Sequence, residues 1–165
     1  MIGLRRTLRR DALARLAFLI LAVVGLAAVL GPWLTPHDPL AVELSANYQP
    51  SSSRHWLGTD HLGRDTLSRL IAGARVSLGI ALASTLTGLA AGAAIGLTAA
   101  WRRGVVERLL LQMIDILLAL PELLLAITAI TILGRGTIST VVAVAVYAVP
   151  SFARITRAAA QPLVG

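Results

Sequence analysis

The stretch VSLGIALASTLTGLAAGAAIGLTAA, residues 76–100, decides the fold class because its 25 residues contain no charged side chain. An α-helix needs about 20 mainly apolar residues to cross the hydrocarbon core of a bilayer, so the stretch predicts a transmembrane helix. The whole chain supports this reading, since 56% of its 165 residues are hydrophobic and only 14% are charged. Ordinary soluble domains are more polar. We expect an all-α integral membrane protein.

Three further apolar runs predict about four spans in all. Residues 16–34 carry no charge, residues 109–133 contain two acids, and residues 136–153 include a proline near their end. Basic residues before the first run resemble the start of a signal peptide, but no small-residue cleavage pattern follows Trp33. We therefore expect the first run to remain as a membrane anchor.

The arginines predict an orientation. The chain has fifteen arginines, no lysine and a formal net charge of +7. Such a balance in a soluble protein would suggest nucleic acid as a partner, but these arginines adjoin the apolar runs and indicate the lipid bilayer instead. Placing the N-terminus inside puts ten arginines in the cytoplasm and five outside, which agrees with the positive-inside rule. Residues 1–15 are then a cytoplasmic basic tail, residues 35–75 are external, residues 101–108 form a cytoplasmic turn and residues 134–137 an external turn.

The predicted external segment has two parts. Prolines and serines between residues 35 and 54 disfavour helix and predict an extended loop. After Asp60, apolar residues recur at helical spacing on one face, and Asp65 precedes Arg69 by four residues, as in a helical ion pair. We expect an amphipathic helix in the outer interface, with Gly73 allowing the chain to turn into the membrane.

Three motifs carry a family resemblance that extends over residues 12–157. They are HWLGTDHLGRDTLSRLIAGARVSL at residues 55–78, PHDPLAVELSANYQP at 36–50 and MIDILLALPELLLAI at 113–127. Together they resemble a family of permease subunits of ATP-binding-cassette importers, the group serving dipeptides, oligopeptides and nickel. The signature residues at the external interface are His55, Gly58, Asp60, Gly63, Arg64, Asp65, Arg69 and Arg75.

The resemblance implies a function that involves no covalent chemistry on this chain. A permease subunit of a binding-protein-dependent importer, in a bacterial-type inner membrane, would move peptides or a related small solute by alternating access. It would work with a second permease subunit, two ATPase subunits and an external substrate-binding protein. The resemblance also implies a cytoplasmic coupling loop with a Glu-Ala-Ala motif and two more spans. Because the sequence stops at Gly165 without that motif, we expect a chain truncated before the coupling loop.

Small residues repeat every fourth position in the second span. Gly88, Gly92 and Gly96 lie on one helix face, where a neighbouring helix can approach closely. We expect this face to be a packing seam within the permease core or against the partner subunit.

The third span contains polar residues that are costly in lipid. Asp115 lies two turns from Arg108, so we expect it to have a structural role near the cytoplasmic end. Glu122 follows Pro121, which removes a backbone donor and leaves the carbonyl of Leu117 without its usual helical partner. We expect a kink there, and for Glu122 both pathway lining and structural pairing remain open.

Histidines and aspartates in the external segment raise the question of a metal site. Their spacing matches no compact ligand motif, so we expect neither a metal nor another cofactor. No phosphate-binding loop is visible, because the glycine repeats lack the lysine of a nucleotide site. The residues considered are His37, His55, His61, Asp38, Asp60 and Asp65.

Two alternatives to the importer remain open. An ion- or proton-coupled carrier would use Asp115 and Glu122 as titrating groups. A non-transporting membrane fragment would follow from the missing coupling loop.

Overall fold

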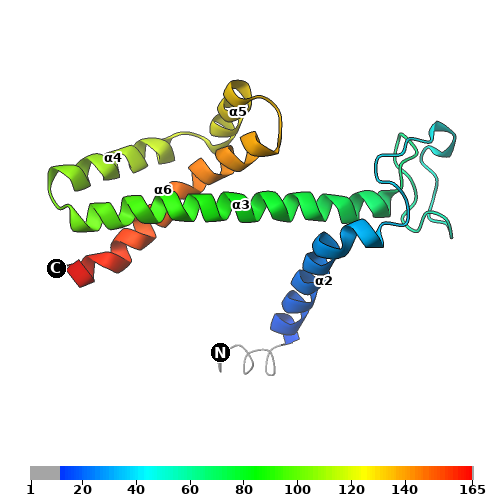
Figure 1. Ribbon diagram of the computed structural model, residues 1–165, viewed down its shortest axis with the longest axis horizontal. Coiled ribbons are helices and arrows are strands. Elements are labelled where there is room, and N and C mark those ends of the chain that lie inside the picture. Colours follow the sequence, from blue (N-terminus) through cyan, green and yellow to red (C-terminus); the bar gives the residue numbers. More distant parts are fainter. Residues whose placement is uncertain (1–11, 165) are drawn as a thin grey trace. The chain divides into compact units, whose positions relative to one another are not determined.

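The computed structural model describes residues 12–164, apart from the side chains of Pro32, Glu122 and Leu123. In this range the regular structure is helical, and an isolated antiparallel bridge between Thr59 and Asp65 is its one strand-like pairing (Figure 1). The all-α prediction is confirmed. The predicted basic tail falls mainly on residues 1–11, outside the described residues. The elements are α2 (Ala12–Leu34), the 3₁₀-helix η1 (Leu44–Ala46), α3 (Thr66–Trp101), α4 (Val105–Ala119), α5 (Glu122–Leu133) and α6 (Thr137–Val164).

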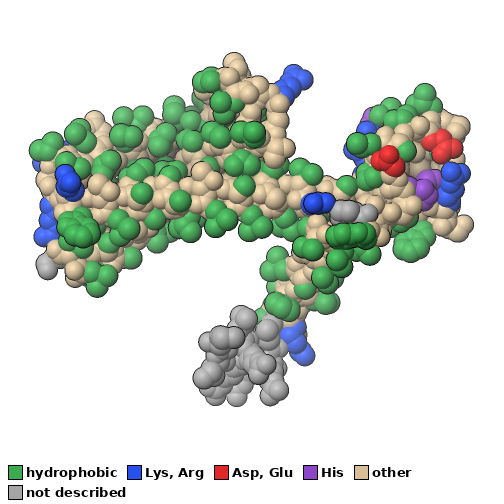
Figure 2. Space-filling model, viewed as in Figure 1, with side chains coloured by type: hydrophobic (Ala, Val, Ile, Leu, Met, Phe, Trp, Pro, Cys, Tyr) green, Lys and Arg blue, Asp and Glu red, His purple; other side chains and the backbone are tan. Residues whose placement is uncertain are grey.

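Three of the described helices, α2, α3 and α6, are long and apolar enough to cross a membrane. The α4–α5 pair supplies a fourth crossing if its two bent halves count as one span. Only 6% of the apolar window of α2 is buried within the chain, 17% of that of α3 and 28% of that of α6. Hydrophobic side chains accordingly cover the helices in the space-filling view (Figure 2). Such surfaces are stable against lipid or other membrane helices and would be costly in water.

The chain divides into two compact units, residues 1–78 and residues 79–165. In the first unit, α2 approaches the start of α3 closely at Gly31. A Cβ added at Gly31 would lie 3.1 Å from Cγ2 of Ile71 and 3.6 Å from its backbone oxygen. The segment between the two helices is not simply extended, because it contains η1 and several turns.

The structure corrects the expected turn at Gly73. Helix α3 runs without interruption from Thr66 to Trp101, so the amphipathic stretch and the apolar span form one helix of 36 residues. Glycine permits a turn but does not impose one, whereas a continuous helix satisfies every interior backbone amide and carbonyl. A separate interfacial helix is therefore not seen.

The third expected span is two helices in the structure instead of one. Residues 109–133 were expected to form one kinked helix, but the chain breaks at Leu120 and Pro121, and α4 and α5 meet at an angle of 96°. Leu120 has extended dihedral angles (φ −84°, ψ 132°), the conformation that a following proline favours. The Leu117 carbonyl lacks its usual helical partner, as expected, and accepts a hydrogen bond from the Leu120 amide at 3.4 Å instead.

In the second unit, α6 packs against α3 along the face that carries the three repeated glycines (Figure 1). An added Cβ would lie 3.0 Å from Cβ of Ala148 at Gly88, 2.7 Å from the Val149 oxygen at Gly92 and 2.5 Å from the Ala153 oxygen at Gly96. Backbone atoms are the obstacles at the last two positions, and they cannot rotate away as a side chain would. The absence of a side chain at these positions permits the approach of the two helices.

We expect Gly92→Leu to lower the melting temperature of the detergent-solubilised protein strongly, because the new side chain collides with the α6 backbone. Overpacking of this kind costs about 1–3 kcal/mol. Ala91→Leu is the matched control, since Ala91 is exposed on the same helix. Equal melting temperatures for the two variants in a thermal unfolding assay would contradict the packing role of Gly92.

Candidate functional site

The signature residues form a folded loop in the first unit, held together by backbone hydrogen bonds between segments 43–52 and 55–66. The amides of Glu43 and Tyr48 donate to the carbonyls of Leu62 and Asp60, both at 3.1 Å. Thr59 lies at the centre of the loop: its hydroxyl accepts the Gln49 amide at 2.8 Å and donates to the Ala46 carbonyl. The loop therefore satisfies its own polar groups by folding back on itself.

Two signature glycines are required where segments 43–52 and 55–66 pass close to each other. Gly58 and Gly63 have φ angles of +70° and +72°, in the left-handed region that favours glycine. An added Cβ would also collide with the backbone oxygen of Gln49 at Gly58 and with that of Glu43 at Gly63. Neither position has room for a side chain.

Asp60 closes the turn that leads into α3. Its carboxylate accepts the amides of Leu62 at 2.8 Å and Arg64 at 3.1 Å, and it pairs with the guanidinium groups of Arg64 at 2.8 Å and Arg69 at 3.4 Å. Partial desolvation acts to raise the pKa of Asp60, but the Arg64 hydrogen bond, the two amides and the Arg64 charge together hold it well below its usual range. Arg69 thus pairs with Asp60, not with Asp65 as the helical spacing suggested.

Asp65 is the buried carboxylate that begins α3. It precedes Thr66, and its Oδ2 accepts the Ser68 amide at 2.8 Å, as an N-cap residue does. Its Oδ1 lies 3.0 Å from Nδ1 of His55, a side chain that is also buried. Burial acts to raise the pKa of Asp65, but the hydrogen bonds from Ser68 and His55 and an electrostatic contribution from His37 outweigh it and lower the pKa.

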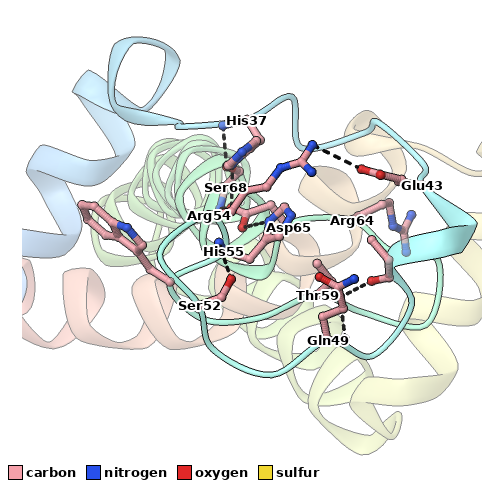
Figure 3. A network of polar contacts seen from close by, with 12 residues as sticks. His37, Glu43, Gln49, Ser52, Arg54, His55, Thr59, Arg64, Asp65 and Ser68 are labelled. Atoms are coloured by element: carbon pink, nitrogen blue, oxygen red, sulfur yellow. Dashed lines mark hydrogen bonds and ion pairs between the residues drawn. The ribbon is translucent and has the colours of Figure 1, made fainter.

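His37 joins this buried pair from the loop that follows α2. Its amide donates to the Ser68 hydroxyl at 3.1 Å, its Nδ1 lies 3.9 Å from Oδ2 of Asp65, and its ring is 4.8 Å from the ring of His55. Figure 3 shows the three side chains gathered beside the first turn of α3. One possible ligand atom from each of His37, His55 and Asp65 lies within 4.8 Å of the others. We call these three residues the His–His–Asp cluster.

The remaining residues considered for a metal or for the signature lie apart from this cluster. His61 is exposed, and so is Asp38, whose carboxylate accepts the Leu40 amide at 2.9 Å. Arg75 is exposed on α3 and lines a groove with Gly31 and Thr35. Sequence spacing missed the cluster because its members are separated by a folded loop, and no local motif connects position 37 to position 65.

The second unit contains two ion pairs between α4 and α6. Asp115 accepts a hydrogen bond from Arg154 at 2.6 Å, and Glu107 accepts two from Arg157 at 2.9 and 2.5 Å. Pairing reduces the cost of placing these charges at or within a membrane. The pairs join positions 39 and 50 residues apart, so neither was evident from the sequence. The side chain of Glu122 lies outside the described residues, while Pro121 stands at the break between α4 and α5.

Comparison with known families agrees with this architecture. Residues 3–50 match the N-terminal transmembrane domain of oligopeptide transport permease C. Residues 88–164 match the inner membrane component of binding-protein-dependent transport systems.

Curated relatives give the same result. The di/tripeptide transport system permease protein DppC of Pseudomonas aeruginosa is 43% identical over 156 residues, which are 91% of this chain and 51% of that protein. The glutathione transport system permease protein GsiD of Pectobacterium atrosepticum is 36% identical, with 93% of this chain and 51% of that protein covered. The nickel transport system permease protein NikC of Escherichia coli K12 is 37% identical, with 87% and 52% covered.

The fold and these matches define a multi-pass inner-membrane protein of the transport permease class. The chain belongs to the family of inner membrane components of binding-protein-dependent transport systems, in the group that includes permeases named for peptides, glutathione and nickel. It spans about half the length of the curated relatives it matches. The predicted family is confirmed.

We expect Gly63→Ala to destabilise the loop, because alanine is strained at a φ of +72° and its Cβ would collide with the Glu43 oxygen. The cost should exceed about 1 kcal/mol. Gly73→Ala is the matched control: nothing lies within 4 Å of its added Cβ, and alanine favours a helix by up to about 1 kcal/mol. Thermal unfolding of the two variants should therefore shift in opposite directions, and a Gly63→Ala protein as stable as the wild type would contradict the assignment.

Proposed function

We propose that this chain is a permease subunit, or part of one, of an ATP-binding-cassette importer for peptides or a related small solute. It would move its substrate by alternating access, with a second permease subunit, two ATPase subunits and an external substrate-binding protein. The observation that carries the proposal is the 43% identity with a di/tripeptide permease across 91% of this chain, which includes both the folded loop and the helices of the second unit.

The distribution of charge supports an importer over a proton-coupled carrier. Asp115, which such a carrier would use as a titrating group, is engaged in a 2.6 Å ion pair with Arg154. Exchange of a proton at this carboxylate would require this ion pair to open. In the importer, the same pair would connect α4 to α6 and help the two helices to move together.

The coupling energy would come from another subunit. ATP-driven closure of the ATPase pair must be transmitted to the membrane helices through a surface on the cytoplasmic side. The basic turn 101–108 and the arginines near the end of α6 lie on that side in the proposed orientation, with the N-terminus in the cytoplasm. The segment 35–65 would then face outward, toward the substrate-binding protein.

The orientation is tested by fusing a reporter that is active only outside the cytoplasm. We expect signal at Ser52 and none at Gly104. A third fusion at Arg135 examines the bent α4–α5 pair: signal there means that the pair crosses the membrane, and silence means that it re-enters on the cytoplasmic side. Signal at Gly104 would overturn the orientation.

The transport function is tested in the organism that carries the gene. Deletion of the coding sequence should abolish uptake of a labelled dipeptide or of another substrate of this family, and restoring it from a plasmid should recover the uptake. Orthovanadate in membrane vesicles should block the restored uptake, whereas a protonophore with ATP present should leave most of it.

Loss of uptake with the protonophore alone would favour the proton-coupled carrier. Unchanged uptake of every family substrate after the deletion would contradict a transport role. A panel of dipeptides, oligopeptides, glutathione and Ni²⁺ would identify the substrate class.

A further inference from the structure

The His–His–Asp cluster has the chemistry of a site for a divalent transition metal. Two imidazoles and one carboxylate form an N₂O donor set, which suits Zn²⁺ and related ions; Mg²⁺ and Ca²⁺ prefer oxygen ligands alone. The three residues come from distant positions in the loop segment and meet beside the first turn of α3 (Figure 3).

The separations of the donor atoms fit a common ion. Zinc binds histidine nitrogen and carboxylate oxygen at about 2.0–2.2 Å, so two ligands of one ion stand roughly 3.0–3.5 Å apart. Nδ1 of His55 and Oδ1 of Asp65 are 3.0 Å apart, and Nδ1 of His37 and Oδ2 of Asp65 are 3.9 Å apart. All three ligand atoms lie within 4.8 Å of one another, so the widest pair needs to close by up to roughly 1.3–1.8 Å. His37 can make this adjustment because its side chain is 33% exposed.

An unsatisfied polar atom supports the assignment. Nδ1 of His37 is buried and has no hydrogen-bond partner among the described residues. It faces Oδ2 of Asp65, but the distance of 3.9 Å is too long for a hydrogen bond. A buried polar atom without a partner is costly, and an ion bound between His37 and Asp65 would remove that cost. Asp65 is only 2% exposed, and its two oxygens already face the two histidines.

The surrounding charges do not oppose a cation. Arg54 is 3.6 Å from Glu43, and Arg64 and Arg69 pair with Asp60 at 2.8 and 3.4 Å. Arg54 thus pairs with Glu43, and Arg64 and Arg69 share Asp60, so none of these three guanidinium groups pairs with Asp65.

We propose that His37, His55 and Asp65 bind one divalent transition metal ion of the zinc class, with water in the remaining coordination positions. The ion would replace the hydrogen bond between His55 and Asp65, and bound metal would tie the loop after α2 to the start of α3. This inference does not depend on the proposed transport function.

Zinc binding is tested on the full chain, purified in detergent without a polyhistidine tag, treated with a chelator and then titrated with Zn²⁺ by calorimetry. We expect one Zn²⁺ per chain, an affinity at least about tenfold lower in His37→Ala, and no response to Mg²⁺. His61→Ala is the matched control, because it removes an exposed histidine of the same segment and should bind as the wild type does.

Two further measurements test zinc binding even if a variant folds poorly. Zn²⁺ should raise the melting temperature of the wild type and of His61→Ala but not that of His37→Ala, because an ion that binds only the folded state stabilises it. Co²⁺ in the wild type should produce visible absorption bands typical of nitrogen and oxygen ligands. Absence of zinc binding by the wild type, or equal affinities for wild type and His37→Ala, would overturn the proposal.

Discussion

Every backbone amide and carbonyl that enters the hydrocarbon core needs a partner within the protein, and this constraint explains the main features of the chain. It favours the unbroken α3 over a turn at Gly73, since an interruption would expose polar groups. It also limits irregular backbone among the described residues to the loop before α3, to short turns and to the break at Pro121. There the Leu120 amide still donates to the Leu117 carbonyl.

The polar loop meets the same requirement without being a helix. Its amides pair across segments 43–52 and 55–66, and the carboxylates of Asp60 and Asp65 accept most of the donors at the entrance to α3. Hydrogen bonds of this kind constrain the backbone of the loop and so limit where its side chains can lie. The His–His–Asp cluster is one consequence, because His37 is fixed against Ser68 through its own backbone amide.

Close packing and ion pairs connect the helices of the second unit. The glycines of α3 let α6 approach until its backbone oxygens would touch an added Cβ. Asp115 and Glu107 of α4 then pair with arginines on the C-terminal half of α6. Lipid tails are as apolar as the side chains of these helices, so helices in a membrane gain little from the hydrophobic effect when they associate. Close packing and specific polar pairs are the interactions that remain. In the alternating-access permease proposed above, such pairs would be suitable points of coupling.

The sequence by itself determined the membrane class, the approximate positions of three apolar helices, the glycine face and the family, because hydropathy, spacing and motifs are local properties of a chain. It also placed the signature glycines, although only the crossing of two segments explains why Gly58 and Gly63 have no room for a side chain. The tertiary structure decided which charges pair and which side chains meet: Arg69 with Asp60, Asp115 with Arg154, and His37 with His55 and Asp65. These contacts depend on how distant segments fold together, and no periodicity in the sequence indicates which distant residues meet.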